Sequence, residues 1–160
     1  MDNNRFIIEN FLSKEDCQSL IDDVCKTNNW EDKGGNSNVL IHKTNRHDII
    51  KNIHKKINEI FESKYYVQLI RMVHKTTEES FWEEHTDNSG VKETADIIYG
   101  IIIYLNEDFD GGSLEYSDMS IKPKTGMLVC HAGNIAHKVS KVDNGNRYTV
   151  TTFIRSKNDQ

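Results

Sequence analysis

Residues 96–105 read DIIYGIIIYL and contain the longest apolar run of the chain. Isoleucine dominates the run, and Asp96 at its first position is the only charged residue. A half-exposed strand would alternate apolar and polar side chains, whereas an apolar run of this length is typical of a strand that is covered on both faces. The run is too short and too interrupted to span a bilayer as a helix. We therefore predict that residues 96–105 form a central, doubly covered strand.

The segments after residue 64 show the two-residue period of β-strands. Turn-forming residues separate them, notably NEDFDGG at 106–112 and DNGN at 143–146. Further strands are predicted at 65–74, 81–85, 113–116, 119–121, 127–131, 137–142 and 148–154.

The first 64 residues show the helical period instead. Ser13 is a candidate N-cap, followed by an acidic first turn and by apolar residues at i, i+3, i+4 and i+7, namely Cys17, Leu20, Ile21 and Val24. A second amphipathic helix is predicted over 48–62, and a short strand at 6–8. Residues 31–48 are polar and contain glycine, so we expect a mobile loop there.

Two helices followed by about eight short strands are typical of a mainly β (α+β) domain with helices packed outside a sandwich or barrel. A jelly roll is the favoured architecture, because it encloses a pocket between its two sheets. The chain of 160 residues fits a single domain, 1–160, with a helical N-terminal part, 1–64, and a β-core, 65–156.

Composition restricts the classes of partner. The net charge is −5 and no long basic run occurs, which argues against a nucleic-acid partner or an anionic membrane surface. The three cysteines form no CxxC pair, and the first residues lack the features of a signal peptide. We expect a cytoplasmic protein with free thiols. The sequence does not indicate an oligomeric state.

A candidate metal site begins with His85-Thr86-Asp87. Positions i and i+2 of a strand share one face, so both side chains can reach one ion. The pair alone is weak evidence, and a third ligand is needed from a distant strand. His137 is the best candidate, because it opens a strand-like segment after a turn of small residues. Two histidines and one carboxylate form the facial set that binds Fe(II) and leaves other coordination positions open.

A candidate carboxylate receptor follows. Arg147 lies ten residues after His137, beyond a predicted hairpin turn that returns the chain to the same pocket. A buried arginine needs an anionic partner, and a carboxylate matches its planar guanidinium. Thr149 shares the strand face of Arg147.

From Phe6 almost to the end, this combination resembles the Fe(II)/2-oxoglutarate-dependent dioxygenases, most closely the small prolyl 4-hydroxylase-like branch. Each matching stretch is modest alone, but their joint spacing is specific. The stretches are FIIENFLSKEDC (6–17), HTD (85–87), IIIYLNEDFDGGSLEY (101–116), KPKTGMLVCHAG (122–133) and HKVSKVDNGNRYTVTTF (137–153).

The resemblance implies a double-stranded β-helix, a variant of the jelly roll. It implies that Fe(II) is held by three side chains, those of His85, Asp87 and His137. It also implies that Arg147 binds the distal carboxylate of 2-oxoglutarate. Tyr104 matches a tyrosine that hydrogen-bonds this carboxylate in some relatives, and Thr149 occupies a hydroxyl position two residues after the basic residue.

One position departs from the pattern. Relatives usually carry a tyrosine about ten residues before the first ligand histidine, whereas this chain has His74 within RMVHKTTEE (71–79). His74 either donates the same hydrogen bond or ends a strand. His131 is expected to be a packing residue, and Trp82 a core or rim aromatic side chain.

The implied activity is hydroxylation of a peptide or protein substrate, with peptidyl proline favoured and with release of succinate and CO₂. Ascorbate is expected as a reductant, and residues 31–48 are a candidate lid over the substrate. Two alternatives stay open. One is a 2-oxoglutarate oxygenase that acts on another side chain or on a free amino acid. The other is a catalytically silent, metal-binding β-sandwich used for recognition.

Overall fold

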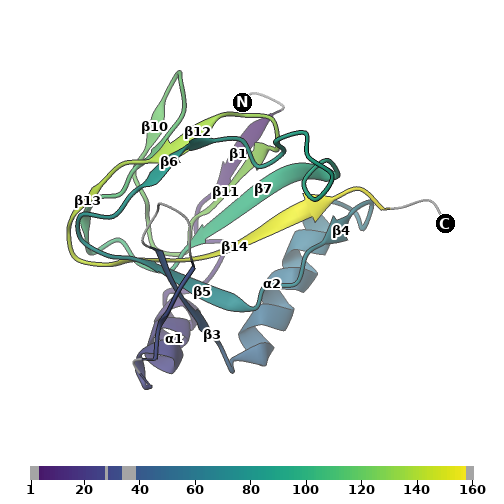
Figure 1. The fold of residues 1–160 in the computed structure, drawn as a ribbon. Coiled ribbons are helices and arrows are strands. Elements are labelled where there is room, and N and C mark those ends of the chain that lie inside the picture. The colour runs from purple at the N-terminus through teal and green to yellow at the C-terminus, as the bar shows by residue number, and fades with distance from the viewer. Residues whose placement is uncertain (1–3, 28, 34–38, 158–160) are drawn as a thin grey trace.

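The computed structural model describes residues 4–27, 29–33 and 39–157 (Figure 1). Its helices are α1 (Lys14–Cys25) and α2 (His47–Ile60). Its strands are β1 (Arg5–Ile8), β2 (Glu31–Asp32), β3 (Val39–Lys43), β4 (Tyr66–Val67), β5 (Met72–Thr76), β6 (Trp82–His85), β7 (Ile97–Tyr104), β8 (Asp110–Gly111), β9 (Leu114–Glu115), β10 (Ser120–Ile121), β11 (Leu128–Ala132), β12 (His137–Val139), β13 (Val142–Asn144) and β14 (Arg147–Arg155).

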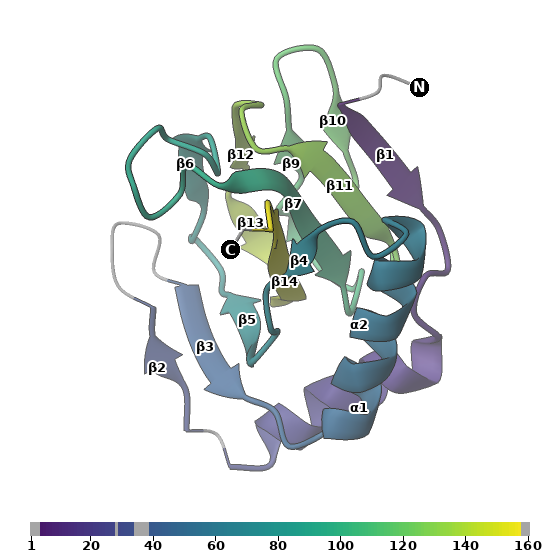
Figure 2. The same cartoon turned by 90° about the vertical axis from the view of Figure 1, so that its right-hand side faces the viewer.

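The largest sheet is built around β7. Its strand order is β1-β11-β7-β14-β5-β3-β2, and β4 pairs with the far end of β14. Figure 2 shows β1 alongside β11 at one edge and β3 with β2 at the other. Alternate residues of β7 enter two different hydrophobic clusters, with Ile101 and Ile103 on one face and Ile102 and Tyr104 on the other. The prediction of a central, doubly covered strand is confirmed.

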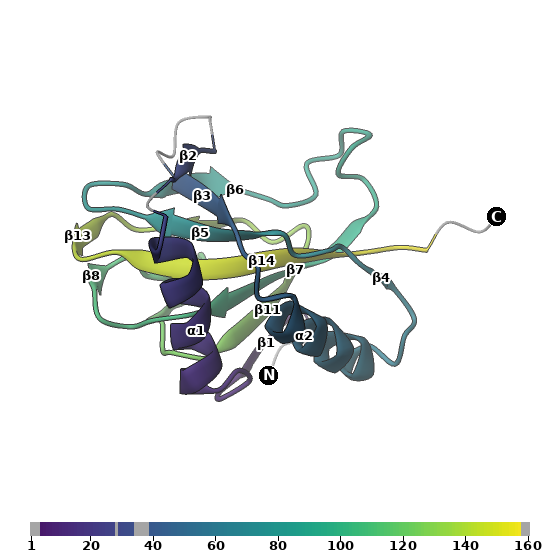
Figure 3. The ribbon, with the colours of Figure 1, turned by 90° about the horizontal axis from the view of Figure 1, so that it is seen from below.

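Both helices cover one face of this sheet, below β14, β7 and β11 in Figure 1 and in front of them in Figure 3. The Ser13 side chain accepts a hydrogen bond from the Asp16 N–H, which caps α1 as predicted. The apolar face of α2 is fully inserted into the core and consists of Ile49, Ile50, Ile53 and Ile57. Neither helix combines the length and apolarity that a membrane crossing requires.

A smaller sheet, in the order β10-β9-β12-β6, covers the opposite face, and β13 pairs with β8 at one end. Every strand pair is antiparallel among the described residues. The second hydrophobic cluster fills the space between the sheets, with Tyr104, Leu114 and Val139 at its centre. The predicted mainly β jelly roll with helices outside is therefore confirmed.

The prediction of a mobile loop over 31–48 is wrong for its described residues. β2 and β3 form a hairpin that extends the large sheet beyond β5, and His47–Ile60 already belongs to α2. The ladder with β5 supplies backbone hydrogen bonds that local composition does not reveal. Residues 34–38 lie outside the described residues. The N-terminal part, 1–64, is thus not only helical, because it contributes β1, β2 and β3 to the sheet.

The segment predicted as one strand over 65–74 is divided. β4 and β5 pair with different parts of β14, and the Gln68 N–H bonds the Phe153 carbonyl oxygen between them. The strand predicted over 137–142 is likewise divided between β12 and the start of β13. Both interruptions follow strand pairing, which a period-2 pattern does not encode.

Candidate metal centre and adjoining pocket

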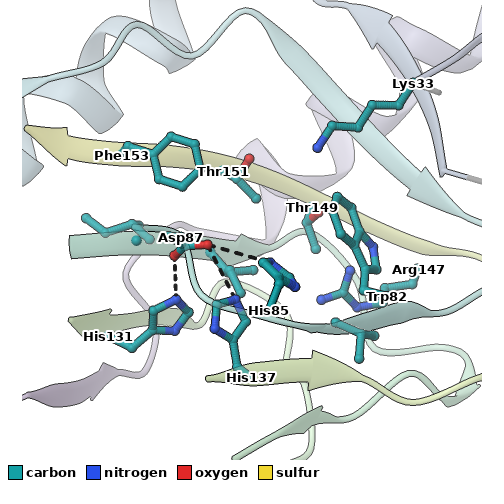
Figure 4. Close-up of a pocket in the computed structure, with 14 residues that line it drawn as sticks. Lys33, Trp82, His85, Asp87, His131, His137, Arg147, Thr149, Thr151 and Phe153 are labelled. Carbon is teal, nitrogen blue, oxygen red and sulfur yellow. Dashed lines mark hydrogen bonds and ion pairs between the residues drawn. The ribbon is translucent and has the colours of Figure 1, made fainter. Parts of the chain in front are cut away.

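Three predicted side chains converge between the two sheets. β12 pairs with β6 so that His137 lies opposite His85, and Asp87 follows β6 by two residues. Asp87 Oδ1 lies 3.6 Å from His85 Nε2 and 3.5 Å from His137 Nε2. One potential ligand atom from each residue lies within 4.8 Å of the other two (Figure 4). A single metal ion fits between these three atoms.

Backbone contacts orient the two imidazoles. Nδ1 of His85 lies 2.7 Å from the carbonyl oxygen of Glu83. Nδ1 of His137 lies 2.9 Å from the carbonyl oxygen of Ile135. An Nδ1–H that donates to a carbonyl leaves the Nε2 lone pair directed at the centre. Burial and the neighbouring His131 lower the pKa of His137 to about 4. His137 is therefore neutral at pH 7, the form that binds metal.

Asp87 is held on its other side by a chain of aromatic and imidazole groups. Asp87 Oδ2 lies 2.8 Å from His131 Nε2, and His131 Nδ1 lies 2.8 Å from the Tyr116 hydroxyl. Arg5 stacks over the Tyr116 ring and forms a bidentate pair with Asp118. Burial raises the pKa of Asp87, but the His131 hydrogen bond and the neighbouring imidazoles outweigh it, so the pKa is lowered. Asp87 is thus a fixed carboxylate.

The sequence interpretation missed the role of His131, which was expected only to pack. His131 on β11 pairs with Gly100 on β7, and its side chain is 1% exposed. A Cβ at Gly100 would lie 2.0 Å from Asp87 Oδ2 and 2.9 Å from His131 Nε2. The available signal was this glycine, which interrupts the isoleucine run and admits the carboxylate.

A second polar group lies beside the metal centre. Arg147 on β14 is 3% exposed, and its guanidinium carbon lies 5.2 Å from the centroid of the Tyr104 ring. Thr149 pairs with His74 on one side and with Tyr104 on the other, so these side chains share a face of the sheet. The structure therefore brings together the four residues predicted to bind the co-substrate.

Arg147, Tyr104, Thr149 and His74, together with the neighbouring Thr76 and Trp82, form a polar region that we call the cradle, and several of its polar atoms lack a hydrogen-bond partner. Among the described residues, five buried side-chain polar atoms lack a hydrogen-bond partner: His74 Nδ1, Thr76 Oγ1, Trp82 Nε1, Tyr104 Oη and Arg147 Nε. Each unpaired buried group costs about 1–3 kcal/mol, and such groups are rare in folded proteins. Strand pairing of Thr76 with Arg147 and ring contact of Trp82 with His74 place them in one region. Their concentration indicates a site for a polar ligand.

The cradle is cationic. Burial lowers the pKa of His74 to about 4, and the charges of Lys33 and Arg147 act in the same direction. Burial raises the pKa of Tyr104, although the charge of Arg147 and the hydrogen-bonding approach of its guanidinium to the Tyr104 hydroxyl oppose this effect. His74 and Tyr104 are therefore uncharged donors or acceptors around one buried cation. This arrangement suits a carboxylate.

One pocket joins the metal centre to Arg147 and opens to solvent. It is lined by His85, Asp87, His137, Arg147 and Thr149, and further by Lys33, Trp82, Thr151 and Phe153 (Figure 4). Trp82, expected in the core or rim, thus lies on the pocket wall. Lys33 belongs to the segment 31–48, so the described part of the candidate lid borders the pocket.

No family model and no curated protein matches the sequence. The fold is similar to several solved prolyl hydroxylases. The collagen prolyl hydroxylase of Paramecium bursaria Chlorella virus-1, solved as a 2-oxoglutarate complex, is 21% identical with a TM-score of 0.79, over 98% of this chain and 97% of that chain.

Two further structures agree. A Pseudomonas putida prolyl 4-hydroxylase is 15% identical with a TM-score of 0.74, over 96% of this chain and 93% of that chain. A Trichoplax adhaerens prolyl hydroxylase, in complex with a hypoxia inducible factor peptide fragment, is 16% identical with a TM-score of 0.76. The match covers 96% of this chain and 84% of that chain. The double-stranded β-helix implied by the resemblance to the prolyl 4-hydroxylase-like branch is confirmed.

Gly100→Ala should weaken metal binding without unfolding the protein. The added Cβ displaces Asp87 from His131, and loss of such outer contacts typically lowers metal affinity about 10- to 100-fold. Calorimetric titration with Mn²⁺ measures the affinity, and circular dichroism verifies the fold. Ser120→Ala is the control, because Ser120 is an exposed residue of β10 outside the pocket and the change adds no atom. Unchanged Mn²⁺ affinity in Gly100→Ala would contradict the required close approach.

His74 should make the metal-free protein sensitive to acid. Its pKa is about 4 in the folded state, against about 6.5 in the unfolded chain, so protons bind the unfolded state first. Stability is therefore lost as pH falls from about 6.5 to about 4. His74→Phe has no imidazole at this position and therefore avoids this loss. The free energy of unfolding of the variant minus that of the wild type should be about 2 kcal/mol larger at pH 4.5 than at pH 7. Urea unfolding at both pH values measures it; parallel pH profiles would refute it.

Proposed function

We propose that this protein is an Fe(II)- and 2-oxoglutarate-dependent dioxygenase that hydroxylates a peptidyl substrate, with proline favoured, and releases succinate and CO₂. One observation carries the proposal. A group of two histidines and one carboxylate shares a single pocket with the buried side chain of Arg147, whose Nε lacks a hydrogen-bond partner. The fold likeness to prolyl hydroxylases, one of them solved with 2-oxoglutarate, supports it.

The donor set fits Fe(II). His85, Asp87 and His137 supply two imidazoles and one carboxylate, which is the facial set of non-haem Fe(II) oxygenases. A structural zinc site would be closed by four ligands and is usually rich in cysteine. Burial raises the pKa of both Cys17 and Cys130, which belong to the hydrophobic core. When bound, Fe(II) together with 2-oxoglutarate would supply the activation of O₂, the oxidant of the reaction.

The cradle fits the far end of 2-oxoglutarate. We assign the distal carboxylate to Arg147, whose guanidinium can donate two parallel hydrogen bonds. The Tyr104 hydroxyl and the Thr149 hydroxyl are assigned to the same end. His74 takes the place of the usual tyrosine, and as a neutral imidazole it keeps one N–H to donate. A bound carboxylate would accept hydrogen bonds from the Arg147 guanidinium and from neighbouring donors that otherwise lack a partner.

Contacts within the chain hold the metal-binding side chains in position. His131 holds Asp87 whether or not an ion is present, and the Ile135 and Glu83 carbonyls hold the two imidazoles. Held geometry lowers the entropic cost of bringing reactants together. Apolar side chains of Ile102 and Val139 line the pocket between these groups and limit competing reactions with water.

Peptidyl proline is the substrate we favour, because several solved structures of like fold are prolyl hydroxylases and one of these is in complex with a peptide fragment. The replacement of tyrosine by His74 favours a second candidate in the same class. This is a 2-oxoglutarate oxygenase that acts on another side chain or on a free amino acid.

The proposed function is tested with protein reconstituted anaerobically with Fe(II), 2-oxoglutarate and ascorbate, and then exposed to O₂ with and without proline-rich peptides. We expect peptide-stimulated succinate and one added oxygen on proline by mass spectrometry. Asp87→Ala should abolish turnover, because it removes the only anionic metal ligand. Substrate-coupled succinate from Asp87→Ala would overturn the metal assignment, and product on another residue would select the second candidate.

Arg147→Met should weaken 2-oxoglutarate binding at least about 30-fold, since loss of a buried partner for a carboxylate costs about 2 kcal/mol or more. Titration of 2-oxoglutarate into the Mn²⁺-loaded protein measures this effect. Arg147→Lys should keep part of the affinity, and Arg46→Met, at a site outside the pocket, should keep all of it. An unchanged affinity in Arg147→Met would remove the arginine from the co-substrate site.

A further inference from the structure

A lysine from the edge hairpin reaches the same pocket. Lys33 directly follows β2, and its N–H bonds the Val39 carbonyl oxygen at 2.8 Å, which anchors its backbone to β3. Its side chain crosses the face of Trp82, with Nζ 4.3 Å from the ring centroid. Figure 4 shows the ammonium pointing into the pocket, toward the β14 residues Thr149 and Thr151.

Trp82 separates this lysine from the co-substrate cradle. One face of the indole contacts Lys33, while its ring also neighbours His74 and its Nε1 is among the unpaired cradle atoms. In Figure 4 the indole stands between Lys33 and Arg147. The two cations therefore serve different parts of the pocket, Arg147 the inner part and Lys33 the outer part.

The outer part also contains a hydroxyl and an aromatic ring. Thr149, Thr151 and Phe153 alternate along β14, so all three point to the face that lines the pocket. Phe153 is partly buried and offers apolar surface beside Thr151. A flat apolar wall with one cation opposite it suits a peptide segment that carries an acidic group.

The charges of the pocket leave Lys33 to an incoming ligand. Among the described lining residues the cations are Lys33 and Arg147, and Asp87 is the only carboxylate. Asp87 is also the carboxylate whose charge acts on Lys33, but its two oxygens already face His131 and the metal-centre imidazoles. Because no carboxylate of the described pocket lining is left to pair with the Lys33 ammonium, a negative group of a ligand can do so, and the outer part of the pocket favours an anionic ligand.

Resting on the proposed function, we propose that Lys33 is a specificity-determining residue that binds a carboxylate of the substrate next to the hydroxylated residue, so that the preferred substrate is an acidic peptide. The two carboxylates of 2-oxoglutarate are assigned to the metal centre and to Arg147, which leaves Lys33 for the substrate. The Lys33 stem remains over Trp82 and positions the ammonium.

The test measures peptide affinity for the Mn²⁺- and 2-oxoglutarate-loaded protein by fluorescence anisotropy. Three labelled peptide mixtures share a central proline, random outer positions and an amidated C-terminus. They differ in the residue on both sides of the proline, which is Glu in the first mixture, Gln in the second and Lys in the third. A fourth carries Gln and a free C-terminal carboxylate. We expect the Glu mixture to bind at least about tenfold tighter than the Gln mixture, a ratio that corresponds to about 1.4 kcal/mol. A gain confined to the fourth mixture would identify a terminal carboxylate as the ligand.

Variants locate the preference. Lys33→Met keeps an apolar stem over Trp82 and should bind the Glu and Gln mixtures equally. Lys33→Arg should retain the preference, and Lys33→Glu should favour the Lys mixture. Lys122→Met, which removes an exposed lysine outside the pocket, should behave like wild type.

The proposal is overturned if the wild type binds all mixtures equally or binds none, or if the acidic preference survives in Lys33→Met. It is also overturned if Lys33→Met weakens 2-oxoglutarate instead of the peptides, because Lys33 would then belong to the co-substrate cradle. A wild-type protein that binds 2-oxoglutarate but shows no acidic preference refutes only this inference. A wild-type protein that does not bind 2-oxoglutarate refutes the proposed function as well.

Discussion

The architecture depends on the burial of both faces of β7. Isoleucine side chains project to each side of this strand, so a single covering layer would leave half of them in water. α1 and α2 cover one face, and the smaller sheet covers the other. Two residues of the same strand that are not isoleucine, Gly100 and Tyr104, face the candidate site. Gly100 lets Asp87 approach His131, and Tyr104 lies beside Arg147. Core packing and site geometry are therefore set by one element.

Polar groups are tolerated in this interior because they fall into two classes. Those of the metal centre are paired in the folded chain: Asp87 with His131, and His131 with Tyr116. Those of the cradle are buried without a partner, including atoms of His74, Tyr104 and Arg147. The first class fixes geometry before any ligand arrives. The second is an unfavourable arrangement in the ligand-free protein, and binding of a carboxylate relieves it. The contrast explains why we assign the metal to one end of the pocket and the co-substrate to the other.

Charge is distributed along the pocket in the same order. Asp87 with its imidazoles lies at the metal centre, the buried guanidinium of Arg147 lies in the cradle, and the ammonium of Lys33 lies over Trp82 nearer to solvent. Burial keeps His74 and His137 neutral at pH 7, so neither adds a positive charge that would repel a metal ion. A protein with a net charge of −5 thus presents a locally cationic cavity. This local sign, and not the overall charge, is what a ligand in the pocket meets.

The sequence alone determined most of the segments that form the strands of a mainly β core, because apolar periodicity records which faces must leave water. It also singled out His85, Asp87, His137 and Arg147, through residue types whose chemistry is specific and whose spacing matched a known pattern. Only the tertiary structure decided what surrounds them. Strand pairing turned the polar segment 31–48 into a sheet edge that carries Lys33, placed His131 against Asp87, and grouped the unpaired atoms around Arg147. These contacts join residues that are distant along the chain, and their close approach depends on register and on the missing Cβ of Gly100, which no local pattern of residues encodes.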